Sequence, residues 1–136
     1  MNKPLLLVVE PDGVLAGSLR AALSGSGYDV VHAYTAQEAV IKADQSIPAL
    51  VILELQLVGH SGMEFLYEFR SYSDWERVPV IIYSSVPPGE FAGSRETLLE
   101  QLGVRAFLYK PNTPLTELVQ TVNNLRQMVS RSNESI

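Results

Sequence analysis

The chain has 136 residues, 46% of them hydrophobic and 18% charged, so it can fold as one domain around a sizeable core. It contains no cysteine, which excludes disulfide bonds, thiolate zinc sites and thiol nucleophiles. Its net charge of −5, with ten Lys and Arg scattered along the chain, argues against a nucleic-acid partner.

No apolar run approaches the length that spans a bilayer, and the first residues lack the layout of a signal peptide. We therefore expect a cytoplasmic protein that has no membrane partner.

The first third of the chain predicts two strand–helix units. Leu5–Val9 is a short apolar run without alternation, which is typical of a strand buried on both faces of a parallel sheet. Asp12 then starts a helix as its N-cap, and the glycines of Ser24–Gly27 end it. The strand Tyr28–Ala33 follows. The next helix begins at a capping box in Thr35–Glu38.

The middle of the chain repeats the strand–helix pattern. Leu50–Leu53 is a buried strand that leads directly into Glu54. A second capping box, Ser61–Glu64, opens the third helix. The fourth strand is Val78–Tyr83, followed by Ser84 and a proline-rich loop.

The last third predicts two helices around the fifth strand. Leu98, Leu99 and Leu102 recur on the inner side of the fourth helix. The fifth strand is Ala106–Tyr109, and apolar residues at helical spacing then predict a final helix as far as about residue 129. Residues 131–136 are expected to be a frayed tail.

Five strands alternating with five helices predict an α/β, doubly wound parallel sheet, flavodoxin-like, with the strand order 2-1-3-4-5. In this order the first and third strands are neighbours at the switch point. Glu10 and Glu54 then face each other across one crevice, and Ser84 and Lys110 lie at the ends of the next two strands. Ligands of such sheets bind at this edge.

Five stretches together resemble the receiver domain of two-component response regulators. The resemblance covers essentially the whole chain and makes residues 1–130 a receiver-like domain. The matching stretches are Leu7–Glu10, Pro48–Leu55, Gly59–Glu64, Val78–Ile81 with Ser84, and Gly103–Pro111.

The resemblance implies a set of site residues. In typical receivers an acidic pair after the first strand and an aspartate after the third hold Mg²⁺, and that aspartate accepts a phosphoryl group from a histidine kinase. By position, Glu10 matches the first acid of the pair and Ser84 matches the hydroxyl that binds the phosphate. Lys110, followed by Pro111 in a cis bond, matches the lysine, and Phe107 matches the mobile aromatic.

Two positions depart from the family pattern. Pro11 replaces the second acid, and Glu54 replaces the phosphoacceptor aspartate, which leaves Glu10, Glu54 and Gln56 as a vestigial metal set. These changes displace ligands by more than an ångström, beyond the roughly 0.5 Å tolerance of a working site. We expect no cofactor. Mg²⁺ would bind only if a group such as Asp12 replaced the missing acid, and the capping role of Asp12 competes.

A glutamate at position 54 extends its carboxylate into the space of an aspartyl phosphate. There it can accept hydrogen bonds from Lys110 and Ser84, as a weak imitation of the phosphorylated state with one negative charge in place of about two. This predicts a phosphorylation-independent pseudo-receiver that signals by protein–protein contact and is not an enzyme. A phosphorelay receiver with residual phosphotransfer and a small hydrolase using Glu10 and Glu54 are the alternatives.

The resemblance also implies a partner surface. Receivers bind partners or self-associate through the fourth helix, the fifth strand and the fifth helix, and Arg105, Phe107 and Tyr109 lie on or beside that face. We expect a protein partner, either a kinase or an output protein, or a homodimer through this face. For Phe107, ordinary core packing is an equal explanation.

Overall fold

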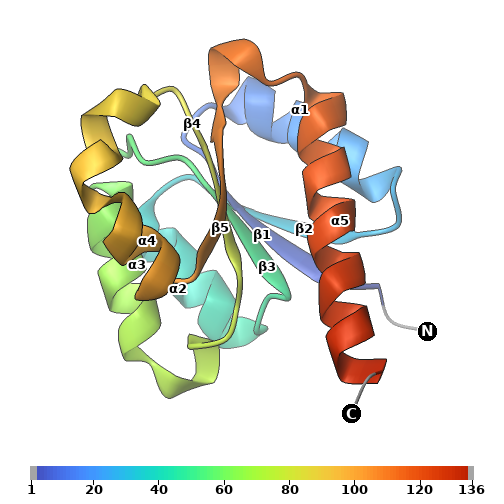
Figure 1. Ribbon diagram of the computed structural model, residues 1–136. Coiled ribbons are helices and arrows are strands. Elements are labelled where there is room, and N and C mark those ends of the chain that lie inside the picture. The colour runs from blue at the N-terminus through green and yellow to red at the C-terminus, as the bar shows by residue number, and fades with distance from the viewer. Residues whose placement is uncertain (1–2, 135–136) are drawn as a thin grey trace.

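One parallel sheet forms the centre of the molecule in this computed structural model, which describes residues 3–134, with side chains as far as residue 128. The strand order β2-β1-β3-β4-β5 confirms the predicted order and the doubly wound fold class (Figure 1). The strands are β1 (Leu5–Val9), β2 (Asp29–Ala33), β3 (Leu50–Leu53), β4 (Val80–Ser84) and β5 (Val104–Tyr109).

Helices cover both faces of the sheet. α1 and α5 pack on one face, and α2, α3 and α4 pack on the other (Figure 1). The helices are α1 (Gly13–Ser24), α2 (Ala36–Gln45), α3 (Gly62–Ser71), α4 (Arg95–Glu100) and α5 (Leu115–Glu134). Within the described residues, no helix has the length and apolarity needed to cross a bilayer.

The first four residues of the tail predicted over residues 131–136 are helical and not frayed. α5 continues to Glu134, so residues 131–134 are helical. Residues 135 and 136 lie outside the described part of the chain.

The predicted caps start the first three helices. Asp12 Oδ1 accepts from the backbone N–H of Val14 at 2.9 Å. Thr35 Oγ1 accepts from Glu38 N at 3.1 Å, and Ser61 Oγ accepts from Glu64 N at the same distance. Each cap satisfies a backbone donor that the helix itself leaves unpaired.

The fourth helix is shorter than the sequence pattern suggested. A 3₁₀ stretch, Pro88–Ser94, precedes the short α4. Leu98 and Leu102 are buried as predicted, whereas Leu99 is 40% exposed. Leu99 lies about a quarter turn from Leu98 around the helix axis, so the two cannot share one inner face.

The core has two layers because alternate strand residues point to opposite faces. Leu7 and Val9 of β1 pack towards α2, α3 and α4, and Leu6 and Val8 pack towards α1 and α5. Burial on both faces explains why the strand sequences do not alternate between apolar and polar residues.

Cationic side chains cover the outer edge of β2. Ala33 O accepts from Glu10 N on the β1 side, so the carbonyls of Val30 and His32 face outward. Arg20 Nη2 donates to Val30 O at 3.4 Å, and Lys42 Nζ donates to His32 O at 2.5 Å. One cation from each flanking helix thus occupies the acceptors with which another strand would pair.

The opposite edge strand, β5, contains one extra residue. Val80 pairs with Val104, but Ile81 pairs with Ala106, which leaves Arg105 without a partner on β4. This bulge reverses the faces of the residues that follow it. Phe107 therefore lies opposite Ile82 and packs on the side of α2, α3 and α4.

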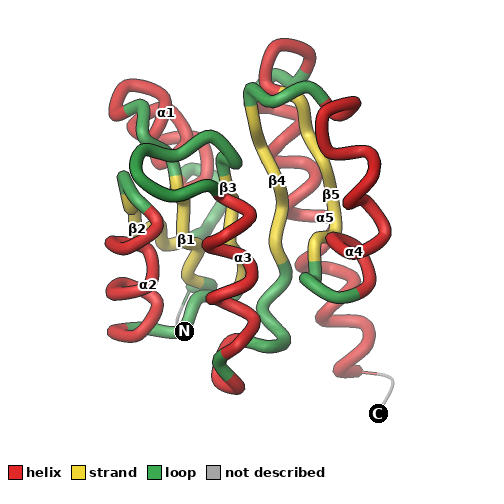
Figure 2. The backbone as a smooth tube through the Cα atoms, turned by 90° about the vertical axis from the view of Figure 1, so that its left-hand side faces the viewer, coloured by secondary structure: helices red, strands yellow, loops and turns green. Residues whose placement is uncertain are grey.

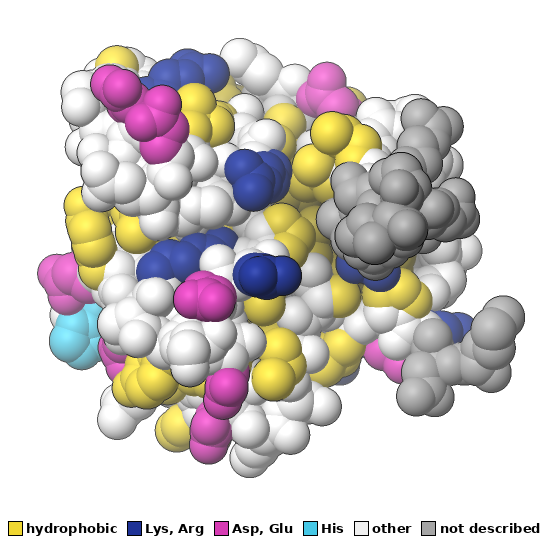
Figure 3. All heavy atoms as spheres, turned by 60° about the horizontal axis from the view of Figure 1, so that its bottom comes forward, with side chains coloured by type: hydrophobic (Ala, Val, Ile, Leu, Met, Phe, Trp, Pro, Cys, Tyr) yellow, Lys and Arg dark blue, Asp and Glu magenta, His cyan; other side chains and the backbone are white. Residues whose placement is uncertain are grey.

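Arg70 fastens the end of α3 to the beginnings of β4 and β5. Its Nε donates to Leu102 O at 2.8 Å and its Nη1 to Trp75 O at 2.6 Å, while Nη2 donates to Val78 O. The guanidinium lies against Gly103, whose φ of 69° and lack of a side chain allow this approach. Figure 3 shows Lys and Arg side chains gathered across the middle of this end of the molecule.

Candidate functional site

Four polar side chains from four strand ends meet at the carboxyl edge of the sheet. Glu10 follows β1, Glu54 follows β3, Ser84 ends β4 and Lys110 follows β5. The loops that leave these strands lie together along the top of Figure 2. Glu10, Glu54 and Ser84 are 2%, 3% and 1% exposed. The structure thus brings together the residues that the sequence placed around one crevice.

The ammonium of Lys110 bridges the two carboxylates. Lys110 Nζ lies 2.5 Å from Glu10 Oε1 and 2.6 Å from Glu54 Oε1. Tyr83 supports the cation, since its ring centroid is 5.7 Å from Nζ. The predicted Glu54–Lys110 contact is therefore present, and it extends to Glu10.

The Glu54 carboxylate accepts hydrogen bonds at both oxygens. In addition to Lys110, Oε1 accepts from the backbone N–H and the hydroxyl of Ser85, each at 3.0 Å. Oε2 accepts from the hydroxyl of Ser84 and from Gln56 N at 3.0 Å. Sequence reasoning missed Ser85 and the backbone donor of Gln56. The only hint was the Ser84–Ser85 pair at the strand end.

Glu10 also accepts hydrogen bonds, at its carboxylate and at its backbone carbonyl. Glu10 Oε2 accepts from Asp12 N at 3.0 Å. His32 Nε2 lies 2.7 Å from the carbonyl oxygen of Glu10, and it must carry the proton of this bond because a carbonyl only accepts. The Asp12 carboxylate caps α1.

Burial and hydrogen bonding act in opposite directions on the pKa of Glu54. Burial raises this pKa, but hydrogen bonds from Lys110, Ser84 and the backbone N–H groups of Gln56 and Ser85 outweigh it and bring the pKa from 4.5 to about 2. Burial likewise lowers the pKa of Lys110, but its bonds to Glu10 and Glu54 outweigh burial and hold that pKa above 10.5. Glu54 and Lys110 are therefore both charged at neutral pH.

These shifts predict how stability depends on pH. Because the pKa of Glu54 is about 2 in the folded protein and 4.5 ordinarily, the unfolded chain takes up the proton first as the pH falls. The contribution of ionised Glu54 is complete above pH 4.5 and is lost as the pH falls through about 2. We expect the free energy of unfolding to fall by about 3 kcal/mol across this window.

Urea unfolding at a series of pH values measures this loss, with Glu54→Gln as the control. The variant has no carboxylate at this position, so its stability should change less across the same window. Equal losses in the two proteins would contradict the assignment.

The donor set does not fit the magnesium site that the resemblance implies. Mg²⁺ requires near-octahedral oxygen ligands at about 2.0–2.1 Å. Here the cationic ammonium of Lys110 already lies between the Glu10 and Glu54 carboxylates, and the other Glu54 oxygen is bonded to Ser84 and Gln56. Among the side chains described, those of residues 3–128, no group of three or more His, Cys, Asp and Glu could hold a metal ion.

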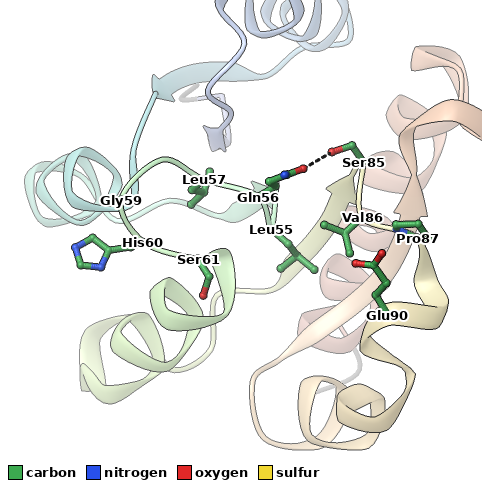
Figure 4. Close-up of a pocket in the computed structure, with 10 residues that line it drawn as sticks. All are labelled: Leu55, Gln56, Leu57, Gly59, His60, Ser61, Ser85, Val86, Pro87 and Glu90. Carbon is green, nitrogen blue, oxygen red and sulfur yellow. Dashed lines mark hydrogen bonds between the residues drawn. The ribbon is translucent and has the colours of Figure 1, made fainter.

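A groove of about 640 Å³ opens beside the carboxylate cluster. Figure 4 shows its walls, which come from the loop after β3 and the loop after β4. Ser85 Oγ lies 3.3 Å from Gln56 Oε1 across the top of this groove. The His60 side chain lies on the outer side of its loop, away from Ser85 and Glu90 (Figure 4).

The predicted partner residues lie on β5. Arg105 is exposed, and Phe107 and Tyr109 are half-buried. The Phe107 ring stacks on Phe91 with centroids 5.5 Å apart, and the Arg95 guanidinium lies 4.9 Å from its centre. Phe107 thus contacts the core and also borders the surface.

One predicted detail of this region is wrong. The described residues contain no cis peptide bond, so the bond between Lys110 and Pro111 is trans. Lys110 reaches the two carboxylates from the first residue of a 3₁₀ turn, Lys110–Asn112.

Comparison with known families decides between the possible interpretations of this fold. The model of the response regulator receiver domain matches residues 6–123. The chain belongs to this family. The two-component character and the receiver fold inferred from sequence are therefore confirmed.

Two curated relatives of this receiver domain are transcriptional regulators. The KDP operon transcriptional regulatory protein KdpE of Escherichia coli is 38% identical over 80 residues, which are 59% of this chain and 34% of KdpE. The probable transcriptional regulator ycf27 of Porphyridium aerugineum is 29% identical over 135 residues, 99% of this chain and 53% of that protein. The chain thus spans only about a third to a half of these relatives.

Solved structures show the same fold. The receiver domain protein (CheY-like) of Methanospirillum hungatei has a TM-score of 0.83 at 21% identity, covering 96% of this chain and 99% of that one. The receiver domain of a putative Luxo repressor protein from Vibrio parahaemolyticus has a TM-score of 0.82 at 26% identity, covering 98% and 97%.

Proposed function

We propose that this receiver domain is a signalling module that binds a protein partner without being phosphorylated. The observation that carries the proposal is the position of the Glu54 carboxylate. It accepts hydrogen bonds from Ser84 and Lys110, the groups that match the phosphate-binding residues of the family. The side chain at the phosphoacceptor position therefore occupies these donors itself.

Charge supports the same proposal. The two carboxylates and one ammonium leave a single net negative charge in a buried cluster, with Lys110 as its only cation. Transfer of a phosphoryl group to Glu54 would replace its one negative charge by about two. The phosphoryl donor is itself an anion, and without a metal ion to neutralise it the cluster repels it. Binding it would also require Glu54 to give up its bonds to Lys110 and Ser85.

The partner is a protein on this proposal. We propose that it is an output protein, a kinase or a second copy of the chain. Arg105, Phe107 and Tyr109 on β5 are the residues we propose for this contact. We propose the cytoplasm as its location, since the family takes part in two-component signalling.

The alternatives receive less support. Residual phosphotransfer would use the ionised Glu54 carboxylate as its nucleophile, which the test below detects directly. A hydrolase would need Glu10 and Glu54 as a separate acid and base, but Lys110 ties the two carboxylates together.

Treatment of the purified protein with acetyl phosphate and Mg²⁺, followed by intact-protein mass spectrometry, tests phosphorylation directly. We expect no phosphoryl adduct. In parallel, titration with Mg²⁺ and beryllofluoride should leave the amide NMR signals of Gln56, Ser84 and Ser85 in place. An acyl phosphate on Glu54, or saturable shifts of these signals, would contradict the proposal.

A further inference from the structure

A second groove, separate from the carboxylate cluster, lies between α2 and α3. Its volume is about 490 Å³. Figures 1 and 2 both show the two helices side by side on the same face of the sheet. Ala36 and Val40 of α2 and Phe65 of α3 form its apolar floor.

The apolar character of the groove continues to the surface. Ile41 lines it and is 53% exposed. Beneath the floor, the Phe65 ring stacks on Phe69 with centroids 5.3 Å apart, so this wall is anchored in the core. A single exposed isoleucine is ordinary, but one at the rim of an apolar groove adds to a surface that a partner can cover.

The rim of the groove is acidic. Glu64 and Glu68 lie one turn apart on α3, where like charges repel each other. Glu64 contacts His60 Nδ1 at 3.0 Å, and Glu68 forms no ion pair with any described residue. No Lys or Arg is among the residues that line the groove. Two carboxylates on one side of an apolar floor thus favour a partner that carries positive charge.

We propose that the α2–α3 groove binds a basic amphipathic helix of a partner protein. Apolar side chains of that helix would enter the floor, and Lys or Arg side chains next to them would pair with Glu64 and Glu68. A helix fits better than a strand because the groove runs between two helices. The nearest sheet edge, β2, has its outward carbonyls occupied by Arg20 and Lys42.

The groove also adjoins the loop that holds Glu54. His60 lines the groove, and its side chain lies on the outer side of the loop between β3 and α3 (Figure 4). The same loop supplies Gln56 N to the Glu54 carboxylate. None of the residues that line the groove belongs to the carboxylate cluster, so the test of this proposal is separate from the test of the proposed function.

A fluorescently labelled synthetic helix tests the proposal, with leucines along one face and lysines along the other. Anisotropy measures its affinity for the whole chain, and amide NMR shifts locate it. We expect shifts confined to α2, α3 and the loop between β3 and α3. We also expect affinity to fall as salt is added.

Two matched pairs of variants separate this groove from general attraction to an acidic protein. Glu64→Gln/Glu68→Gln should weaken binding by about fivefold or more. Glu96→Gln/Glu100→Gln, which removes the same charge at the same spacing on α4, should not. Ile41→Ser should weaken binding to a similar degree, whereas Ile47→Ser, at a residue 56% exposed and outside the groove lining, should not.

Three kinds of outcome would overturn the proposal. One is equal weakening by the groove variants and their controls. Another is the absence of binding to the wild-type chain, or NMR shifts that lie elsewhere. The third is self-association of the chain that Ile41→Ser abolishes, because the groove would then belong to a second copy.

Discussion

Replacement of Lys110 by methionine is expected to lower the free energy of unfolding by about 3–5 kcal/mol at neutral pH. Methionine retains much of the apolar stem but removes the charge. The Glu10 and Glu54 carboxylates, 2% and 3% exposed, would then face each other without a cation. Such a loss is a large fraction of the about 5–15 kcal/mol that stabilises a typical domain. Urea unfolding measures it.

Lys42→Met is the matched control for this experiment. Lys42 pairs with Glu38 at 3.4 Å, but both side chains are about a third exposed, at 33% and 37%. A pair so open to water contributes less than about 1 kcal/mol, and at this edge of the sheet water can replace the bond from Lys42 Nζ to His32 O. A Lys110→Met variant that loses no more stability than Lys42→Met would contradict the importance of the buried bridge.

The pH dependence of Lys110→Met gives a second, sharper criterion. Without the ammonium, burial and the neighbouring carboxylate raise the pKa of Glu54 in the folded state. The folded protein then binds a proton more readily than the unfolded chain, so its stability should rise as the pH falls from neutral. The wild-type protein should show no such rise. Adding Glu54→Gln to the variant should recover part of the lost stability, because one of the two carboxylates that repel each other is removed.

The double substitution Pro11→Asp/Glu54→Asp is expected to convert the site that we propose to be inert into one that acetyl phosphate modifies in the presence of Mg²⁺. Shortening residue 54 by one methylene withdraws its carboxylate from Ser84 and Lys110. The new acid at position 11 supplies an oxygen ligand beside Glu10. Mass spectrometry should then show one phosphoryl group per chain, dependent on Mg²⁺, where the wild-type chain shows none.

The two single variants separate the effects of the two departures from the family pattern, at positions 11 and 54. Glu54→Asp alone restores the acceptor but leaves one acid too few, and we expect slow or incomplete modification. Pro11→Asp alone leaves Glu54 in contact with Lys110, and we expect none. If the double variant remains unmodified under conditions that phosphorylate an ordinary receiver, these two positions do not account for the inertness proposed for the site.

The sequence predicted the sheet well because its strands are buried on both faces. Runs such as Leu50–Leu53 contain no polar residue, and an acid follows both this run and Leu5–Val9, which marks the ends of these two strands. Strand order then placed Glu10 and Glu54 at neighbouring ends by topology alone. The meeting of Glu54 with Lys110 followed from the same geometry.

Contacts that depend on where backbone N–H groups point, or on how far a side chain reaches, could not be predicted from the strand pattern. Glu54 accepts from the backbone N–H groups of Gln56 and Ser85. Every residue except proline has such a group, so the residue type does not show which of them will reach the carboxylate. That Lys110 also bonds Glu10 depends on side-chain reach across the ends of β4 and β3. Leu99 is exposed because it lies about a quarter turn from the buried Leu98 around the axis of α4.

The unpaired residue in β5 could be removed without turning the rest of the strand over. Deleting Arg105 would restore simple pairing with β4, with Ala106 still opposite Ile81 and Phe107 still opposite Ile82. Phe107 would then keep its place beside Phe91 and Arg95, because the partners on β4 fix the face of each side chain. The extra residue therefore adds an exposed cation to this strand without changing which helix the aromatic ring meets.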